Sequence, residues 1–157
     1  MTRRSLTALL AATTLLLGMT VSTALAARPV FVFQTLMTPD REIPTPSDTN
    51  AIGHATVMIR PASDTVCWVL SWNRIDGNMV HAAHIHGPAL TTGTATPKVT
   101  FFQGVEHATT DTDRGCTTSL AWADAIVANP DLFYVNVHSD TIPAGVIRGQ
   151  LGWPPSE

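Results

Sequence analysis

Residues 133–139 read FYVNVHS, and this stretch decides the fold of the 157-residue chain. Its valines alternate with Asn136 and His138, which is the pattern of a β-strand with one apolar and one polar face. The stretch VIRGQL at 146–151 predicts a second strand, reached through a turn that contains proline and glycine. We therefore expect the chain to close with two adjacent strands.

The rest of the chain continues as short segments separated by Pro, Gly, Asp and Asn. One helix is predicted over 118–129, because apolar residues recur there every three or four positions before a proline. Residues 111–115 are predicted to form a polar turn. Further strands are expected over residues 30–37, 53–60, 66–72, 79–86 and 99–102. This pattern indicates an all-β protein, an antiparallel Greek-key or immunoglobulin-like sandwich or barrel with one short helix.

The first 26 residues have the layout of a secretory signal peptide. Arg3-Arg4 form a basic start, an apolar run follows over 6–17, and Ala24-Leu25-Ala26 is a small-residue cleavage site. A membrane anchor is the alternative, but the uninterrupted apolar stretch is short for a span. We expect a signal peptide over 1–26, one domain over 27–157, no membrane span after cleavage, and a secreted or periplasmic location.

Charge and cysteine content narrow the partners and the compartment. The mature domain has seven basic and twelve acidic residues, a net charge of −5, with a single lysine. This composition argues against nucleic acid or an anionic membrane as a partner. The two cysteines, Cys67 and Cys116, make one disulfide the simplest expectation for an exported protein, with a thiol metal ligand or nucleophile as the alternative.

Three histidines occupy positions from which one β-sheet could gather them. His84 and His86 are two residues apart, so on a strand they share a face, and His138 lies on the polar face of a later strand. If the two strands are neighbours, three imidazoles meet, and three neutral nitrogen ligands suit Cu or Zn. His81 and His54 are candidate fourth ligands.

A structural role is the alternative for these histidines. Half-buried imidazoles can bond to backbone carbonyls and fix a corner of a sandwich. In that role, Asn136 and Ser139 are the expected side-chain partners of His84 and His138.

Arg148 lies inside an apolar strand, where a guanidinium needs a carboxylate. We expect a structural ion pair with Glu42, which would tie the N-terminal loop to the last strand. Asp140 is the alternative partner.

Four phrases along the mature chain form an ordered set. They are Glu42-Ile43-Pro44, Gly53-His54-Ala55, AHIHGPA at 83–89, and YVNVH at 134–138 followed by IRGQL at 147–151. In this order they resemble the CHRD domain, the module named after chordin, and the resemblance covers about the whole mature chain. Thr45, Val146 and Ser139 depart from the pattern, and Val146 removes an acid that usually precedes Ile-Arg-Gly. The resemblance implies an extracellular or periplasmic β-sandwich.

The chain resembles the small microbial secreted members of the family, and these imply no specific activity that could be carried over to it. In chordin such domains belong to a protein that captures growth factors, so the implied partner here is an unknown protein or small ligand. Protein capture predicts an exposed apolar patch, for example around Trp153. The His-x-His pair with a later histidine also resembles the copper site of copper–zinc superoxide dismutase, although that family's bridging histidine and zinc ligands are not visible.

The sequence contains no Gly-x-Ser-x-Gly turn, phosphate loop or paired-acid motif, so we predict no catalytic residue and do not infer an enzyme. Two hypotheses follow. The first is an exported CHRD-domain protein that acts as a non-catalytic binding or structural module. The second is a copper- or zinc-binding protein that uses His84, His86 and His138.

Overall fold

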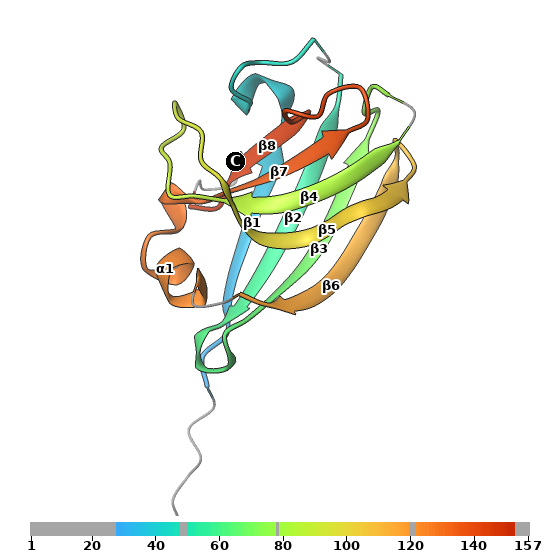
Figure 1. Cartoon of the computed structure of the whole chain (residues 1–157). Coiled ribbons are helices and arrows are strands. Elements are labelled where there is room, and N and C mark those ends of the chain that lie inside the picture. Colours follow the sequence, from blue (N-terminus) through green and yellow to red (C-terminus); the bar gives the residue numbers. More distant parts are fainter. Residues whose placement is uncertain (1–27, 48–49, 78, 120–121, 153–157) are drawn as a thin grey trace, which may run out of the picture.

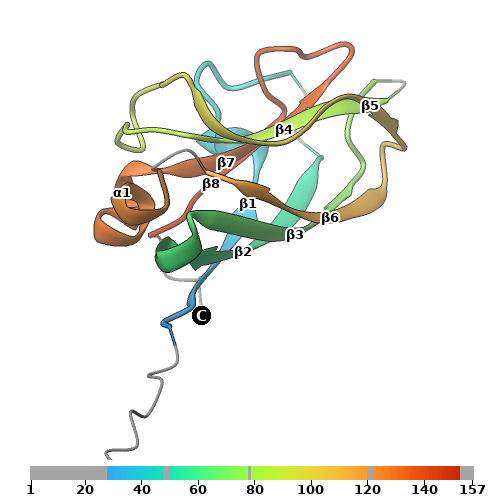
Figure 2. The same ribbon diagram turned by 60° about the horizontal axis from the view of Figure 1, so that its bottom comes forward.

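The structure is a computed structural model that describes residues 28–152, except 48, 49, 78, 120 and 121. Two four-stranded antiparallel sheets pack face to face, in the strand orders β1-β2-β3-β6 and β5-β4-β7-β8 (Figures 1 and 2). The strands are β1 (Phe31–Met37), β2 (Ile52–Arg60), β3 (Thr65–Asn73), β4 (Val80–His86), β5 (Pro97–His107), β6 (Asp111–Thr118), β7 (Tyr134–Ser139) and β8 (Ile147–Gln150). The predicted antiparallel sandwich with one short helix is confirmed.

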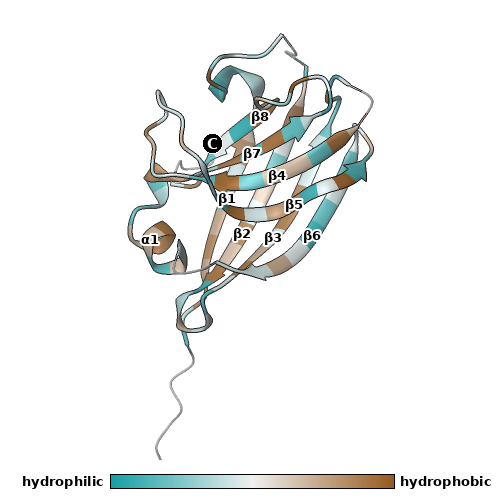
Figure 3. Cartoon of the chain, in the orientation of Figure 1, coloured by the Kyte–Doolittle hydropathy of each residue, from teal (hydrophilic) through white to brown (hydrophobic). Residues whose placement is uncertain are grey.

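Alternation along the strands builds the core between the sheets. On β3, Val66 and Leu70 are fully buried, whereas Val69 is 46% exposed. Apolar and polar residues alternate along most strands, because successive side chains of a strand point to opposite faces of the sheet (Figure 3). The helix α1 (Trp122–Ala128) closes one end of the sandwich (Figure 2), and its Ile126 is buried in the same core.

The predicted polar turn at residues 111–115 is wrong. That segment belongs to β6, which pairs with β3 over eight residue pairs, from Thr65 with Thr118 to Trp72 with Asp111. A strand of Asp and Thr is stable here because backbone pairing with β3 satisfies its polar groups on one side and its side chains are exposed or half-buried. Strand β5 also continues beyond its predicted end, as far as His107.

The expected disulfide joins Cys67 and Cys116, which lie directly opposite each other on β3 and β6. The bridge spans 49 residues of sequence. By loop-closure entropy, a bridge of that span stabilises the folded protein by about 4 kcal/mol.

A short backbone connection links the two sheets at one edge. Thr38 and Arg148 exchange two backbone hydrogen bonds, of 3.0 and 3.2 Å. The link brings the 3-10 turn Pro39–Arg41, and Glu42 after it, next to strand β8. The predicted signal peptide and Trp153 lie outside the described residues. Within the described part of the chain, no helix is long and apolar enough to cross a membrane.

Candidate metal centre

The sheet β5-β4-β7-β8 has a polar face on the side away from the core. Strand pairing sets His84 opposite Asn136, and Asn136 opposite Arg148, so these side chains form a row across β4, β7 and β8. All three residues are nonetheless buried. Their burial follows from the loops that lie over this face, which the hydrogen bonds described below hold in place.

His84, His86 and His138 come together on this face. Each offers one ring nitrogen, and the three nitrogens all lie within 4.8 Å of one another. His84 Nδ1 and His138 Nε2 are 3.2 Å apart. The residues are only 6–8% exposed. Metal–nitrogen bonds are about 2.0–2.1 Å, so the three rings can share one ion after small side-chain rotations.

The outer nitrogens of these rings are held by the loops. His86 Nδ1 donates to the Ala95 carbonyl at 2.8 Å, and His138 Nδ1 donates to the Pro143 carbonyl at 2.9 Å. The side chain of Gln103 bonds to His84. Metal-ligating histidines almost always have such an outer partner, which fixes the tautomer and the orientation of the ring.

The inner nitrogens of His86 and His138 are acceptors. A carbonyl only accepts, so Nδ1 of each of these rings carries the proton and Nε2 has the lone pair. The lone pair of His138 Nε2 accepts a hydrogen bond from His84 Nδ1, which a metal ion bound by both rings would replace. His86 Nε2 is buried and has no hydrogen-bond partner. A buried polar atom without a partner is costly, and a bound cation would satisfy it.

Electrostatics keep the cluster uncharged at neutral pH. Burial lowers the pKa of His138 to about 4 despite its bond to Pro143, and the neighbouring histidines lower the pKa further. Burial also lowers the pKa of His84, and repulsion from His86 lowers it further. Burial lowers the pKa of His86 as well, and repulsion from Arg148 acts in the same direction. Neutral imidazole is the form that binds metals.

The two candidate fourth ligands differ. His54 is exposed on β2, in the other sheet, so it does not join the cluster. His81 lies at a register irregularity of β4, between Val80 and Ala82. A bulge can redirect a side chain. Repulsion from His81 lowers the pKa of both His84 and His138. His81 Nδ1 is buried without a partner, although it lies outside the group of three.

The expected side-chain partners of the histidines are not those in the structure. Asn136 donates to the Glu42 carboxylate, and the Ser139 hydroxyl accepts from the backbone N–H of Ile142. The partners in the structure are Gln103, two loop carbonyls and, for His84 and His138, each other's imidazole, and the sequence did not predict them. The carbonyls belong to loop residues whose type carries no signal, because any backbone can supply them.

Arg148 acts differently from the predicted ion pair with Glu42. Its guanidinium donates to the carbonyls of Gly93 and Leu90 at 2.8 and 3.1 Å. It also donates to Gln150 Oε1 and lies 3.5 Å from the centre of the Tyr134 ring. No direct ion pair with Glu42 occurs among the described residues, although the two charges attract at longer range.

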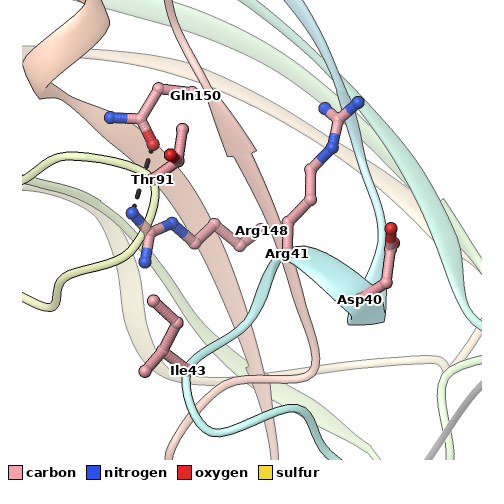
Figure 4. Close-up of a pocket in the computed structure, with 6 residues that line it drawn as sticks. All are labelled: Asp40, Arg41, Ile43, Thr91, Arg148 and Gln150. Atoms are coloured by element: carbon pink, nitrogen blue, oxygen red, sulfur yellow. Dashed lines mark hydrogen bonds between the residues drawn. The ribbon is translucent and has the colours of Figure 1, made fainter.

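These contacts connect Arg148 to the histidines. Tyr134 stacks on the His86 ring with 5.0 Å between centroids, and its hydroxyl accepts from the backbone N–H of Ala95. Arg148 thus fastens the loop that carries the carbonyl partner of His86. A pocket of about 350 Å³ lies beside it, between the 3-10 turn and this loop. Figure 4 shows the guanidinium at the wall of that pocket, bonded to Gln150.

Arg148→Lys is expected to destabilise the protein by about 2 kcal/mol, because a single ammonium cannot bond to Leu90, Gly93 and Gln150 in the geometry of a planar fork. Urea unfolding measures the loss. Arg74→Lys at an exposed position is the matched control and should change little. Equal stability of the two variants would contradict this account of Arg148.

These features define a class of protein. It is a β-sandwich in which one sheet carries a buried histidine cluster on its covered polar face. The model of the CHRD domain matches residues 33–151, so the chain belongs to the CHRD domain family. This confirms the resemblance seen in the four phrases. No curated protein and no solved structure matches the chain.

Proposed function

We propose that this CHRD-domain protein is an exported, non-catalytic binding module that holds one copper or zinc ion through His84, His86 and His138. The observation that carries the proposal is the approach of three buried ring nitrogens to within 4.8 Å of one another. The lowered pKa values and the outer hydrogen bonds support it, since they keep the rings neutral and oriented.

The donor set favours copper. Three imidazoles and no thiolate suit Cu or Zn, and Cu(II) binds a given nitrogen site more tightly than Zn(II). Export agrees with the disulfide, because such bridges persist in oxidising compartments. Three protein ligands leave a coordination position for water or a further small ligand.

A structural role for the same histidines is the competing function, since two of them already bond to loop carbonyls. Isothermal titration calorimetry with Cu(II) and with Zn(II), followed by metal analysis, separates the two. We expect one ion per chain and a large loss of affinity in the double variant His84→Ala/His138→Ala. His54→Ala, which removes an exposed histidine from the other sheet, is the control. Equal affinity in the double variant and the control would leave only the structural role.

His81→Ala is expected to lower the affinity for Cu(II) by less than about tenfold, because His81 influences the cluster only from outside it. The same titration measures this effect. A loss as large as that of a ligand variant would instead make His81 a fourth ligand.

A further inference from the structure

The two sulfurs of the disulfide differ in access. Cys116 lies on β6, which is the edge strand of its sheet, and it is exposed. Cys67 lies on the inner neighbour β3 and is only 5% exposed. An incoming thiolate therefore reaches the sulfur of Cys116 far more readily than that of Cys67.

The positive charge beside the bridge also favours attack at Cys116. Arg60 Nη1 lies 3.3 Å from Cys67 Sγ. An open groove contains both cysteines, and Arg114 lines it together with Arg60. A guanidinium beside a sulfur stabilises the thiolate and makes that sulfur the better leaving group. Two exposed arginines at the groove also attract anions.

The strands do not need the bridge to stay paired. Residues on both sides of the cysteines pair in register along β3 and β6. Trp68 Nε1 also donates to Asp113 Oδ2 across the two strands, at 2.6 Å. Opening the bridge would therefore leave both sulfurs side by side in the same groove, ready to form the bond again.

We propose that the Cys67–Cys116 disulfide is a thiol–disulfide exchange site for anionic low-molecular-weight thiols, which attack it at Cys116. The thiolate forms a bond to Cys116 Sγ, and the bond between the two cysteines breaks with its electron pair on Cys67 Sγ, next to Arg60. A second thiolate then attacks the sulfur of the bound small thiol. The two small thiols leave together as one small disulfide, and Cys116 is released as a thiolate. Two small thiols are thus oxidised and one protein disulfide is reduced.

The first test compares reduction rates of the native protein by glutathione, an anionic thiol, and cysteamine, a cationic one. Each rate is divided by the rate at which the same thiol reduces the bridge in the urea-unfolded protein. This division removes the difference in intrinsic reactivity between the two thiols. We expect the normalised rate to be higher for glutathione. Arg60→Gln should slow the glutathione reaction about fivefold, since it removes the charge-assisted bond to the leaving sulfur. Arg74→Gln, which removes an equal charge elsewhere on the surface, should have no effect.

The second test compares the access of each cysteine to a small disulfide, and for Cys116 the reaction is the reverse of the second exchange step. Cys67→Ser leaves Cys116 as the single thiol, and Cys116→Ser leaves Cys67. With oxidised glutathione, the first variant should form the mixed disulfide much faster than the second, as followed by mass spectrometry. Equal rates, equal slowing by the two arginine substitutions, or reduction of the native bridge only as fast as the protein unfolds would each overturn the proposal. Neither test depends on metal binding, so the outcome is independent of the histidine site.

Discussion

Cu(II) at a free concentration about one hundred times its Kd is expected to raise the melting temperature by about 10 °C. A ligand that binds only the folded state adds about 2.7 kcal/mol at that ratio. In a domain of this size each kcal/mol corresponds to about 3–5 °C. Differential scanning calorimetry with the disulfide intact measures the shift. Zn(II) at the same total concentration should give a smaller shift, because its affinity for a site of nitrogen ligands is lower.

The control variants make this result specific to the cluster. His138→Ala should reduce the affinity for Cu(II) by at least about 100-fold, because removing a ligand costs more than removing an outer partner, which costs about 10–100-fold. His84→Ala/His138→Ala should abolish the thermal shift, whereas His54→Ala should retain it in full. A shift of the same size in the double variant would place the ion elsewhere on the molecule.

Much of this site could be predicted from local sequence pattern. The alternation in β3 and β7 fixes which residues face the core, and the spacing of His84 and His86 puts both on one face. The meeting of that pair with His138 depended on strand pairing, which the sequence left as a condition and the register of β4 with β7 provides. The disulfide followed from cysteine count and the inferred export.

The parts that escaped prediction have physical reasons. Strand β6 contains mostly polar residues, and its stability comes from backbone pairing with β3, so its sequence lacks an apolar period. The irregularity at His81 and the bond between Gln103 and His84 arise from how two strands fit together. Backbone carbonyls can also accept from a buried guanidinium, as they do at Arg148. The rule that a buried arginine needs a carboxylate was therefore too narrow.

Glu42 shows the energetic consequence of that last point. Its carboxylate is buried, accepts from Asn136, and has no direct contact with the Arg148 guanidinium. Burial therefore dominates and raises the pKa of Glu42 to about 7, against a weaker lowering by Arg148 and by hydrogen bonds. The folded protein thus holds a proton on Glu42 over a pH range in which the unfolded chain has lost it.

The sign of the resulting pH dependence follows directly. Between pH 4.5 and about 7 the folded state binds more protons at Glu42 than the unfolded state does, so the contribution of Glu42 to stability falls as pH rises. It is fully present below pH 4.5 and lost above about pH 7, a difference of about 3 kcal/mol. The buried His138 acts in the opposite direction, since its lowered pKa makes stability rise with pH from about 4 to 6.5.

Glu42→Gln isolates the first of these effects. The amide oxygen of glutamine can accept the same bond from Asn136, but it does not titrate, and the histidine contribution is common to both proteins. The variant should therefore match the parent at about pH 4.5 and exceed its free energy of unfolding by about 3 kcal/mol at about pH 8. Urea unfolding across this range, in chelator to exclude metal, measures the difference. Glu106→Gln at an exposed position is the control and should show no such trend. A difference for Glu42→Gln that does not change with pH would mean that the carboxylate is already ionised in the folded protein, and that Arg148 compensates it more strongly than their separation suggests.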